Sequence, residues 1–355
     1  MASGRQKDNP PDEAPNSLPL IRGRRATSYD VARLAGVSQS AVSRCFKPGA
    51  SVSGKMRERV LKAAEELEYQ PNAIARGLIT QRSNLVAVLV SGRLNLYYPE
   101  VLFRLTDELS KVGLRVLLFT VDSEDDAESV IEQAWQFQVD GLISASHLSR
   151  AQYDLLQKRS IPVVFFNRYF TDRSTNVVYC DPRAQVDALV ERLVEFGHRR
   201  FGLIRGPKDN MVGFERIRLV TEALQRYRVA EIREVQGDFT YDSGGAALQE
   251  LCVHPATRPT AIICANDMMA LGCMDEARSV LELNIPDDLS IAGFDGIGMS
   301  QFASYELTTI RQPIGRMCQA AVAMIAARAE LPDQSNERRV FEGAILEGRS
   351  IAKAP

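Results

Sequence analysis

The strongest constraint on the fold comes from residues 27–46, which read TSYDVARLAGVSQSAVSRCF and predict two short helices. Thr27 is placed to cap the first helix, and Asp30 stands three residues later, at the capping-box spacing. Gly36 interrupts the helical pattern, and Ser38 is placed to cap a second helix. Two helices joined by so short a turn form a helix-turn-helix, whose second helix fits the major groove of DNA.

Each of the two helices is expected to have one apolar and one polar face. The apolar positions at helical spacing are Val31, Leu34, Ala35, Ala41, Val42 and Cys45 or Phe46. Gln39, Ser40 and Arg44 face outward. Glutamine can read adenine, arginine can read guanine, and serine can bond a base or a phosphate. The outward face therefore favours DNA contact, and the alternative is an ordinary helix pair with a solvated polar face.

A third helix and a local excess of positive charge support this interpretation. Ser53 opens the segment GKMRERVLKAAEELEYQ, whose apolar residues at helical spacing are Met56, Val60, Ala63, Ala64 and Leu67. Residues 22–82 contain twelve Lys or Arg and five Asp or Glu, a net charge of +7, whereas the whole chain is −2. Contact between this basic region and phosphates would release counterions, so we expect affinity to fall steeply with salt.

The segments TSYDVARLAGVSQSAVSRCF and VSGKMRERVLKAAEELEYQPNAIARGL together resemble the headpiece and hinge of the lactose/galactose repressor (LacI/GalR) family of bacterial transcription factors. A later segment, GFDGIGMSQFASYELTTIRQP, resembles the same family independently, and the likeness runs from about Thr27 to about Ile351. The resemblance implies a ligand-controlled repressor that binds a pseudo-palindromic operator as a homodimer. Residues 1–25 fall outside it and are expected to be disordered.

The resemblance also implies which residues meet operator DNA. In the headpiece and hinge these are Ser38, Gln39, Ser40, Arg44, Lys47, Asn72, Ala75, Arg76 and Leu78. Pro71 ends the third helix, and Asn72 can cap a hinge helix of about two turns, too short to be stable alone. Leu78 stands where family members wedge an apolar side chain into the minor groove, although it could be an ordinary linker leucine. Gly77 is expected to cost the hinge helix about 1 kcal/mol.

Beyond residue 84 the chain alternates apolar runs with amphipathic helices, a pattern typical of parallel sheets wound on both faces. The expected strands include LVAVLV, LRVLLFTV, DGLISA, IPVVFF, RFGLIRG, TAIICA and LSIAGFD. The expected fold is an all-α headpiece followed by an α/β body that resembles periplasmic sugar-binding proteins. The expected boundaries are a headpiece at 26–70, a hinge at 71–83 and a body at 84–351, with an N-lobe at about 84–181 and 313–337 and a C-lobe at about 182–312 and 338–351.

A ligand of such a body is expected between the lobes, at the carboxyl ends of the strands. The resemblance places the effector on Tyr97, Tyr98, Asn167, Arg218, Phe239, Asn266, Asp267, Asp295 and Gln312. Arg218 and Asp295 would together bind neighbouring hydroxyls, because guanidinium donates and carboxylate accepts. Each residue taken singly could equally have a surface or capping role. A sugar, a sugar acid and a nucleoside all suit such a site, and the effector could act as an inducer or as a corepressor.

Other functional classes have weaker support. The glycines of GFDGIG at 293–298 have the spacing GxxGxG rather than GxGxxG, and His198 follows a helix without a recognisable catalytic frame, so we expect neither an enzyme nor a cofactor. The six cysteines are scattered without a CxxC pair, which favours reduced, buried thiols over a metal site. A stand-alone sugar-binding protein is disfavoured by the headpiece.

The ends of the chain and its hydropathy bear on location and assembly. No apolar run approaches the ~20 residues needed to span a bilayer, and MASGRQKDNPPDEAPNSLP lacks the apolar centre of a secretory signal. We therefore expect a cytoplasmic, nucleoid-associated protein with no membrane partner. The segment ERRVFEGAILEGRSI resembles the closing strand of the family, and only AKAP follows it, with no leucine heptads, so we expect a dimer rather than a tetramer.

Overall fold

The structure is a computed structural model that describes residues 25–47, 49–71, 82–91, 96–121, 124–168, 170, 174–208, 210–330 and 335–355. The chain divides into two compact units, Met1–Thr80 and Gln81–Pro355. The expected hinge contacts Asn72, Ala75, Arg76 and Leu78 lie outside the described residues, as do residues 1–24 of the expected disordered extension.

In its described residues, the first unit contains three helices, as predicted: α1 (Ser28–Ala35), α2 (Gln39–Cys45) and α3 (Gly54–Glu66). The Thr27 hydroxyl accepts the Asp30 N–H and the Asp30 carboxylate accepts the Thr27 N–H, which forms the predicted capping box. The Ser38 and Ser53 hydroxyls cap α2 and α3 by accepting the Ala41 and Met56 N–H groups. Gly36 ends α1 at a φ of 64°, a left-handed conformation that glycine adopts without strain. Local sequence therefore accounts for all three helix starts.

The apolar faces of these helices form one small core. Its buried residues are Val31, Ala32, Ala35, Val42, Cys45, Val60, Ala63 and Ala64. The prediction was wrong for Leu34, which is 47% exposed, while Ala32 is buried. The buried stripe of α1 is centred between Val31 and Ala32, and at about 100° per residue Leu34 lies well around the helix from it.

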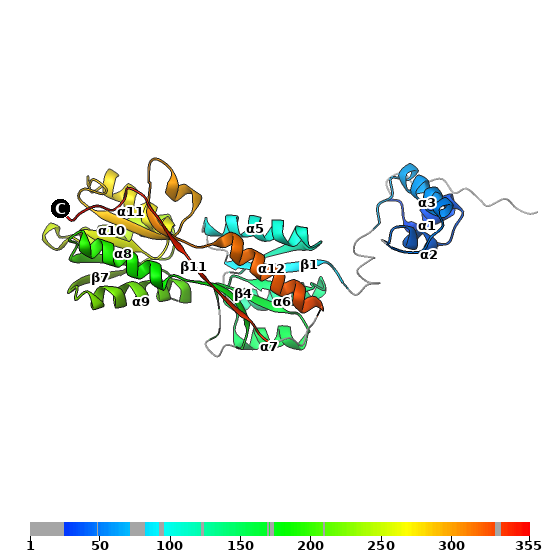
Figure 1. Ribbon diagram of the computed structural model, residues 1–355, viewed down its shortest axis with the longest axis horizontal. Helices are drawn as coiled ribbons and strands as arrows, with labels where there is room; N and C mark the ends of the chain where they lie inside the picture. Colours follow the sequence, from blue (N-terminus) through cyan, green and yellow to red (C-terminus); the bar gives the residue numbers. More distant parts are fainter. Residues whose placement is uncertain are drawn as a thin grey trace, which may run out of the picture. The chain divides into compact units, whose positions relative to one another are not determined.

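Within the part of the chain that the structure describes, the second unit contains two sheets of six strands each. Figure 1 shows helices packed against these sheets. The strand order in the first sheet is β11-β5-β4-β3-β1-β2, and every neighbouring pair is parallel. These strands are β1 (Leu85–Ser91), β2 (Arg115–Val121), β3 (Gly141–Ser144), β4 (Val163–Phe166), β5 (Asn176–Asp181) and β11 (Arg338–Glu342). Its helices are α5 (Tyr97–Lys111), α6 (Glu124–Gln136), α7 (Arg150–Lys158) and α12 (Ile314–Glu330).

Alternation along the strands sends side chains to opposite faces of this sheet. Val86 and Val88 of β1 pack in the cluster that includes α5 and α12, whereas Ala87 and Leu89 pack in the cluster that includes α6 and α7. Because both faces are covered, β1 is apolar at consecutive positions, as expected for a buried parallel strand.

The second sheet repeats this plan in the order β12-β10-β9-β8-β6-β7, with β12 antiparallel to β10. Its strands are β6 (Arg200–Arg205), β7 (Glu231–Gln236), β8 (Ala261–Cys264), β9 (Ser290–Asp295), β10 (Thr308–Arg311) and β12 (Ala344–Leu346). Its helices are α8 (Arg183–Glu195), α9 (Met211–Arg226), α10 (Tyr241–Cys252) and α11 (Asp267–Ser279), with two short 3-10 turns, Pro255–Thr257 and Gly298–Gln301. The two-lobed α/β fold expected from the sequence is confirmed.

The structure corrects the path of the chain near its end. Residues 338–351 were expected in the second lobe, but β11 pairs with β5 of the first sheet, and only β12 joins the second. The chain crosses between the sheets at Gly343, where an added Cβ would lie 2.7 Å from the Arg311 carbonyl oxygen. Three strands were also missed: β7 because it is a largely exposed, polar edge strand, and β5 and β10 because their apolar runs are short.

None of the helices in the described ranges is long and apolar enough to cross a membrane. All six cysteines are described and are free thiols, and Cys264 and Cys273 place their sulfurs 3.7 Å apart.

Candidate DNA-reading helix and effector pocket

Helix α2 presents the polar face expected of a DNA-reading helix. Ser40, Arg44 and Lys47 are exposed, and Gln39 is half-buried. The Ser38 and Ser40 hydroxyl oxygens lie 3.0 Å apart at the start of the helix, and the Gln39 side-chain amide donates to the Ser28 hydroxyl at 3.3 Å. The Gln39 bond ties the reading helix to α1, so the face has a defined orientation within the headpiece.

An arginine that the sequence reading did not single out supports the segment after α2. The guanidinium of Arg57, on α3, donates to the Cys45 carbonyl at 3.0 Å and to the Ala50 carbonyl at 3.4 Å. It thereby satisfies a carbonyl at the end of α2 and another in the segment that follows. No local pattern reveals this bond, because it joins residues 12 positions apart through tertiary packing.

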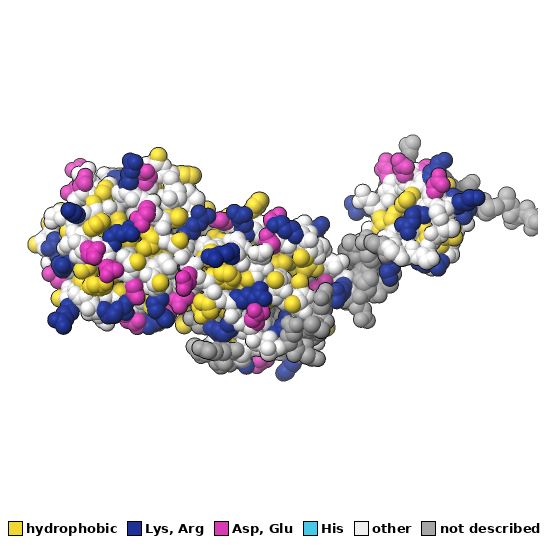
Figure 2. Space-filling model, in the orientation of Figure 1, with side chains coloured by type: hydrophobic (Ala, Val, Ile, Leu, Met, Phe, Trp, Pro, Cys, Tyr) yellow, Lys and Arg dark blue, Asp and Glu magenta, His cyan; other side chains and the backbone are white. Residues whose placement is uncertain are grey.

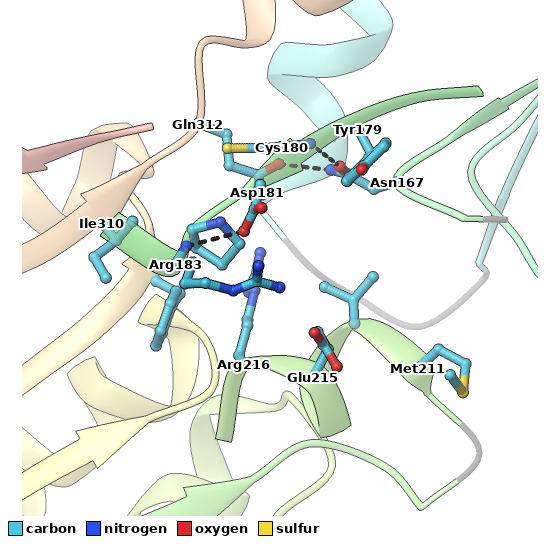
Figure 3. Close-up of a pocket in the computed structure, with 13 residues that line it drawn as sticks. Asn167, Tyr179, Cys180, Asp181, Arg183, Met211, Glu215, Arg216, Ile310 and Gln312 are labelled. Atoms are coloured by element: carbon cyan, nitrogen blue, oxygen red, sulfur yellow. Dashed lines mark hydrogen bonds between the residues drawn. The ribbon is translucent and has the colours of Figure 1, made fainter. Parts of the chain in front are cut away.

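The second unit contains a pocket between its two lobes, with about 850 Å³ of space including the part open to solvent (Figure 3). Its lining comes from both lobes and comprises Asn167, Tyr179, Cys180, Asp181, Pro182, Arg183, Met211, Val212, Glu215, Arg216, Phe294, Ile310 and Gln312. The mixture of polar groups with apolar side chains suits a ligand with both kinds of surface.

A chain of hydrogen bonds runs along one side of this pocket and joins the two lobes. Buried Arg216 donates to Asp295 at 2.7 Å, and the Gln312 amide donates to the same carboxylate oxygen at 2.9 Å. The Gln312 side-chain oxygen in turn accepts from Asn167 at 2.5 Å and from the Tyr97 hydroxyl at 3.1 Å. Burial raises the pKa of Tyr97 well above its usual value, so this hydroxyl keeps its proton and donates.

The structure replaces Arg218 with Arg216 as the arginine of the pocket. Arg218 bonds Glu215 and Glu222 on its own helix and is not part of the pocket lining, so the expected pair of Arg218 with Asp295 is wrong. Arg216 belongs to the buried stripe of α9, three residues after Gly213 and four before Val220. Arg218 lies about 200° further around the helix, which places it outside that stripe. The helical phase of Ile217, Val220 and Leu224 was the signal that could have distinguished the two arginines.

The other expected effector residues divide into two groups. Asn167 and Gln312 line the pocket, and Tyr97 and Asp295 lie directly behind them. The second group is Tyr98, Phe239, Asn266 and Asp267, none of which lines the pocket. The Tyr98 hydroxyl donates to the Ala145 carbonyl, and the Phe239 ring packs where a Cβ on Gly206 or Gly213 would stand.

Asn266 and Asp267 have local structural roles. Asn266 caps α11 and donates its amide to the Phe239 carbonyl at 3.0 Å. Asp267 is fully buried, accepts the Thr309 hydroxyl at 2.5 Å and accepts the Ile297 N–H at 2.9 Å. Burial, reinforced by the nearby Asp295, raises the pKa of Asp267 to about 8. The capping alternative weighed for such residues therefore describes Asn266 well, and Asp267 holds the backbone that follows β9.

Several pocket residues were missed by the sequence reading. Asp181 ends β5 and Arg183 begins α8, so missing that strand hid both of them. Glu215 precedes Arg216 on α9, and Figure 3 shows its carboxylate directed from that helix toward the pocket. Burial raises the pKa of Cys180 to about 11, so this lining thiol is protonated at neutral pH.

Comparison with known proteins assigns a family domain to each of the two units. Residues 27–72 match the model of bacterial regulatory proteins of the lacI family, and residues 190–351 match a periplasmic binding protein-like domain. The HTH-type transcriptional repressor PurR of Aliivibrio fischeri is 31% identical over 325 residues, which cover 89% of this chain and 95% of that protein. The Ribose operon repressor of Haemophilus influenzae is 29% identical over 329 residues, 92% of this chain and 98% of that protein.

Solved structures show the same architecture. A complex of the transcriptional regulator CelR with cellobiose has a TM-score of 0.69 at 28% identity, covering 92% of this chain and all of that one. The Lac repressor dimer bound to operator has a TM-score of 0.84 at 24% identity, covering 93% and 100%, and supports the fold alone.

A helix-turn-helix headpiece followed by a two-lobed binding body defines a ligand-responsive, DNA-binding transcriptional repressor. The chain belongs to the LacI family of bacterial regulatory proteins.

Proposed function

We propose that this repressor acts as a homodimer, with two headpieces on a pseudo-palindromic operator, and that a small molecule in the interlobe pocket releases it. The observation that carries the proposal is the hydrogen-bonded chain from Arg216 through Asp295 and Gln312 to Asn167 and Tyr97, because it joins both lobes beside the pocket. A ligand that exchanges bonds with this chain changes how the lobes are held together. Any resulting change in operator affinity must be matched by an equal change in ligand affinity.

In the headpiece, we propose that Ser38, Gln39, Ser40, Arg44 and Lys47 contact the operator. The exposed face of α2 and the net charge of +7 over residues 22–82 support this assignment. Asn72, Ala75, Arg76 and Leu78 remain a sequence-based proposal for the hinge, with Leu78 as the apolar wedge. The proposal gives the chain no catalytic role and places it in the cytoplasm at the nucleoid.

For the ligand, we propose a sugar or a sugar derivative. The pocket combines amide, carboxylate and guanidinium groups with the apolar side chains of Met211, Val212, Phe294 and Ile310, which suits the alternating polar and apolar surfaces of a sugar. Two similar proteins point the same way by their names, the Ribose operon repressor and the CelR–cellobiose complex.

The test is selection of genomic DNA fragments by the purified protein, followed by titration of the selected sites in the presence of sugars, sugar acids and nucleosides. The expected result is a palindromic site whose affinity drops when one compound class is added. Affinity that rises with the compound would instead identify a corepressor. Failure to enrich any site over a range of salt concentrations would contradict the assignment of α2, and a stand-alone ligand-binding protein would then be the better description.

A further inference from the structure

Glu215 lines the pocket, and its carboxylate is held in place by Arg218, which is not part of the lining. The Arg218 guanidinium donates to both of its carboxylate oxygens, from Nε to Oε2 at 2.9 Å and from Nη2 to Oε1 at 2.6 Å. A two-point pair of this kind fixes the plane of the carboxylate as well as its position. Arg218 also bonds Glu222, one turn further along α9 and outside the pocket lining.

The carboxylate of Glu215 retains acceptor capacity for a ligand. An ionised carboxylate offers about four lone-pair sites, of which Arg218 occupies two. By contrast, the polar groups beside it are largely bonded within the protein. Arg216 donates to Asp295 and to the Ala265 carbonyl, and both groups of the Gln312 amide are used. The pocket therefore offers Glu215 as an acceptor already oriented for a donor such as a hydroxyl.

The charges around the pocket also favour an uncharged ligand. Arg216 is buried against Asp295, which raises its pKa despite the opposing effect of burial, so this cation is already compensated. Glu215 is paired with Arg218, and the Asp181 carboxylate accepts the backbone N–H of the exposed Arg183 at 3.1 Å. A phosphate or carboxylate on a ligand would lose its hydration here, would find Arg216 already compensated by Asp295, and would have Arg183 alone among the lining cations to pair with. It would also approach the carboxylates of Asp181 and Glu215.

We propose that Glu215, held by Arg218 as a positioning residue, determines effector specificity by accepting hydroxyl groups of an uncharged ligand and repelling phosphorylated or carboxylated counterparts. The inference rests on the proposed function and narrows its ligand class. Arg218 thereby has a role in ligand binding, because it positions Glu215 without contacting the ligand itself.

The experiment measures binding of the full-length protein to neutral sugars and nucleosides, each paired with its phosphate or carboxylate counterpart, including ribose with ribose 5-phosphate and cellobiose with cellobionate. Calorimetry gives affinities for the wild type and for Glu215→Gln, Arg218→Met and Glu222→Gln. Glu222→Gln is the matched control, because it removes an acid bonded to Arg218 on the same helix outside the pocket lining.

The wild type is expected to bind a neutral compound at least tenfold more tightly than its anionic counterpart. Glu215→Gln should weaken the neutral compound about tenfold, as for the loss of a hydrogen bond to a charged group, and should bring the anionic counterpart closer to it. Arg218→Met should weaken the neutral compound several-fold with no gain for the anion, because the carboxylate keeps its charge and loses its position. Glu222→Gln should match the wild type.

Three results would overturn the inference: an anionic compound that binds the wild type as tightly as its neutral partner, equal effects of Glu215→Gln and Glu222→Gln, or no binding by any compound. Operator affinity of the wild type, measured in the same preparation, separates the two levels of failure. If the protein binds operator but does not prefer neutral over anionic compounds, only this inference is contradicted. If it does not bind operator, the proposed function is contradicted.

Discussion

At the residue scale, the two arginines of α9 show how one helix separates structural from surface roles. Arg216 is 7% exposed, bonds Asp295 and the Ala265 carbonyl, and lies over the Phe294 ring at 5.1 Å. The Arg218 side chain, paired with Glu215 and Glu222, is 37% exposed. Water therefore screens the ion pairs of Arg218 with Glu215 and Glu222 strongly, whereas it screens the buried pair of Arg216 with Asp295 very little.

We predict that Arg216→Met lowers the free energy of unfolding by about 3 kcal/mol or more, because it leaves the buried Asp295 charge without its partner. The double variant Arg216→Met/Asp295→Asn should recover a large part of that loss, because it removes the unpaired charge. Chemical denaturation provides the measurement, with Arg218→Met as the control on the same helix and an expected cost below about 1 kcal/mol. Equal costs for Arg216→Met and Arg218→Met would refute this reading of the buried pair.

A second prediction concerns Asp267, whose pKa of about 8 lies above the value of about 4 in an unfolded chain. The folded state therefore holds this proton more tightly, so its stabilising contribution is complete below about pH 4 and disappears as the pH rises toward 8. Asp267→Asn resembles the neutral acid and should remove this dependence. The stability of the wild type relative to the variant should fall with pH by up to about 1.4 kcal/mol per unit over this range. A difference that stays constant from pH 5 to 9 would count against a raised pKa.

At the element scale, α10 and α11 pack with almost no space between their backbones. A Cβ on Gly272 would lie 1.9 Å from the Tyr241 carbonyl oxygen, and one on Gly244 would lie 2.1 Å from the Met269 carbonyl oxygen. Glycine is therefore required at these positions for close approach of the helices, although it is a poor helix former.

We predict that Gly272→Ala destabilises the body by about 3 kcal/mol, because backbone on the facing helix must move to admit one methyl group. The matched control is Gly315→Ala in α12, where nothing lies within 4 Å of the new Cβ. That control should be neutral or stabilising by about 0.5 kcal/mol, since alanine favours the helix. Denaturant midpoints with unchanged slopes would measure both, and a mild effect of Gly272→Ala would show that the helices separate easily.

At the scale of the whole molecule, charge is distributed unevenly between the two units. Residues 22–82 carry a net +7 and the whole chain −2, so the rest of the chain is strongly acidic by count. On the face of the body shown in Figure 2, Lys and Arg side chains are interspersed with Asp and Glu. Basic residues are thus concentrated where the exposed face of α2 is found, and the body offers no comparable excess.

We predict that operator affinity falls linearly on a logarithmic plot against salt, and that Lys47→Ala makes the slope shallower by about 0.9 per headpiece, or about 1.8 for a dimer. Lys47 is exposed just beyond α2, whereas Lys158, the control, is exposed in the body. Lys158→Ala should leave the slope unchanged. Titrations of one operator at several salt concentrations would measure the slopes. An unaltered slope for Lys47→Ala would show that Lys47 does not contact a phosphate.

The sequence by itself determined features that depend on neighbouring residues. The caps at Thr27, Ser38 and Ser53 each require groups within three residues, and the alternation of strands and helices follows from periodicity. The family resemblance, together with the rule that ligands meet the carboxyl ends of strands, indicated Asn167, and the resemblance alone indicated Gln312; both line the pocket.

Only the tertiary structure decided which side chains meet across the fold. Arg216 rather than Arg218 reaches Asp295, 79 residues away, because the phase of α9 against the core selects it. The change of sheets at Gly343 depends on β5 and β10, which lie far from it in the chain. Contacts over such separations arise from the packing of whole elements, so local sequence patterns left them open.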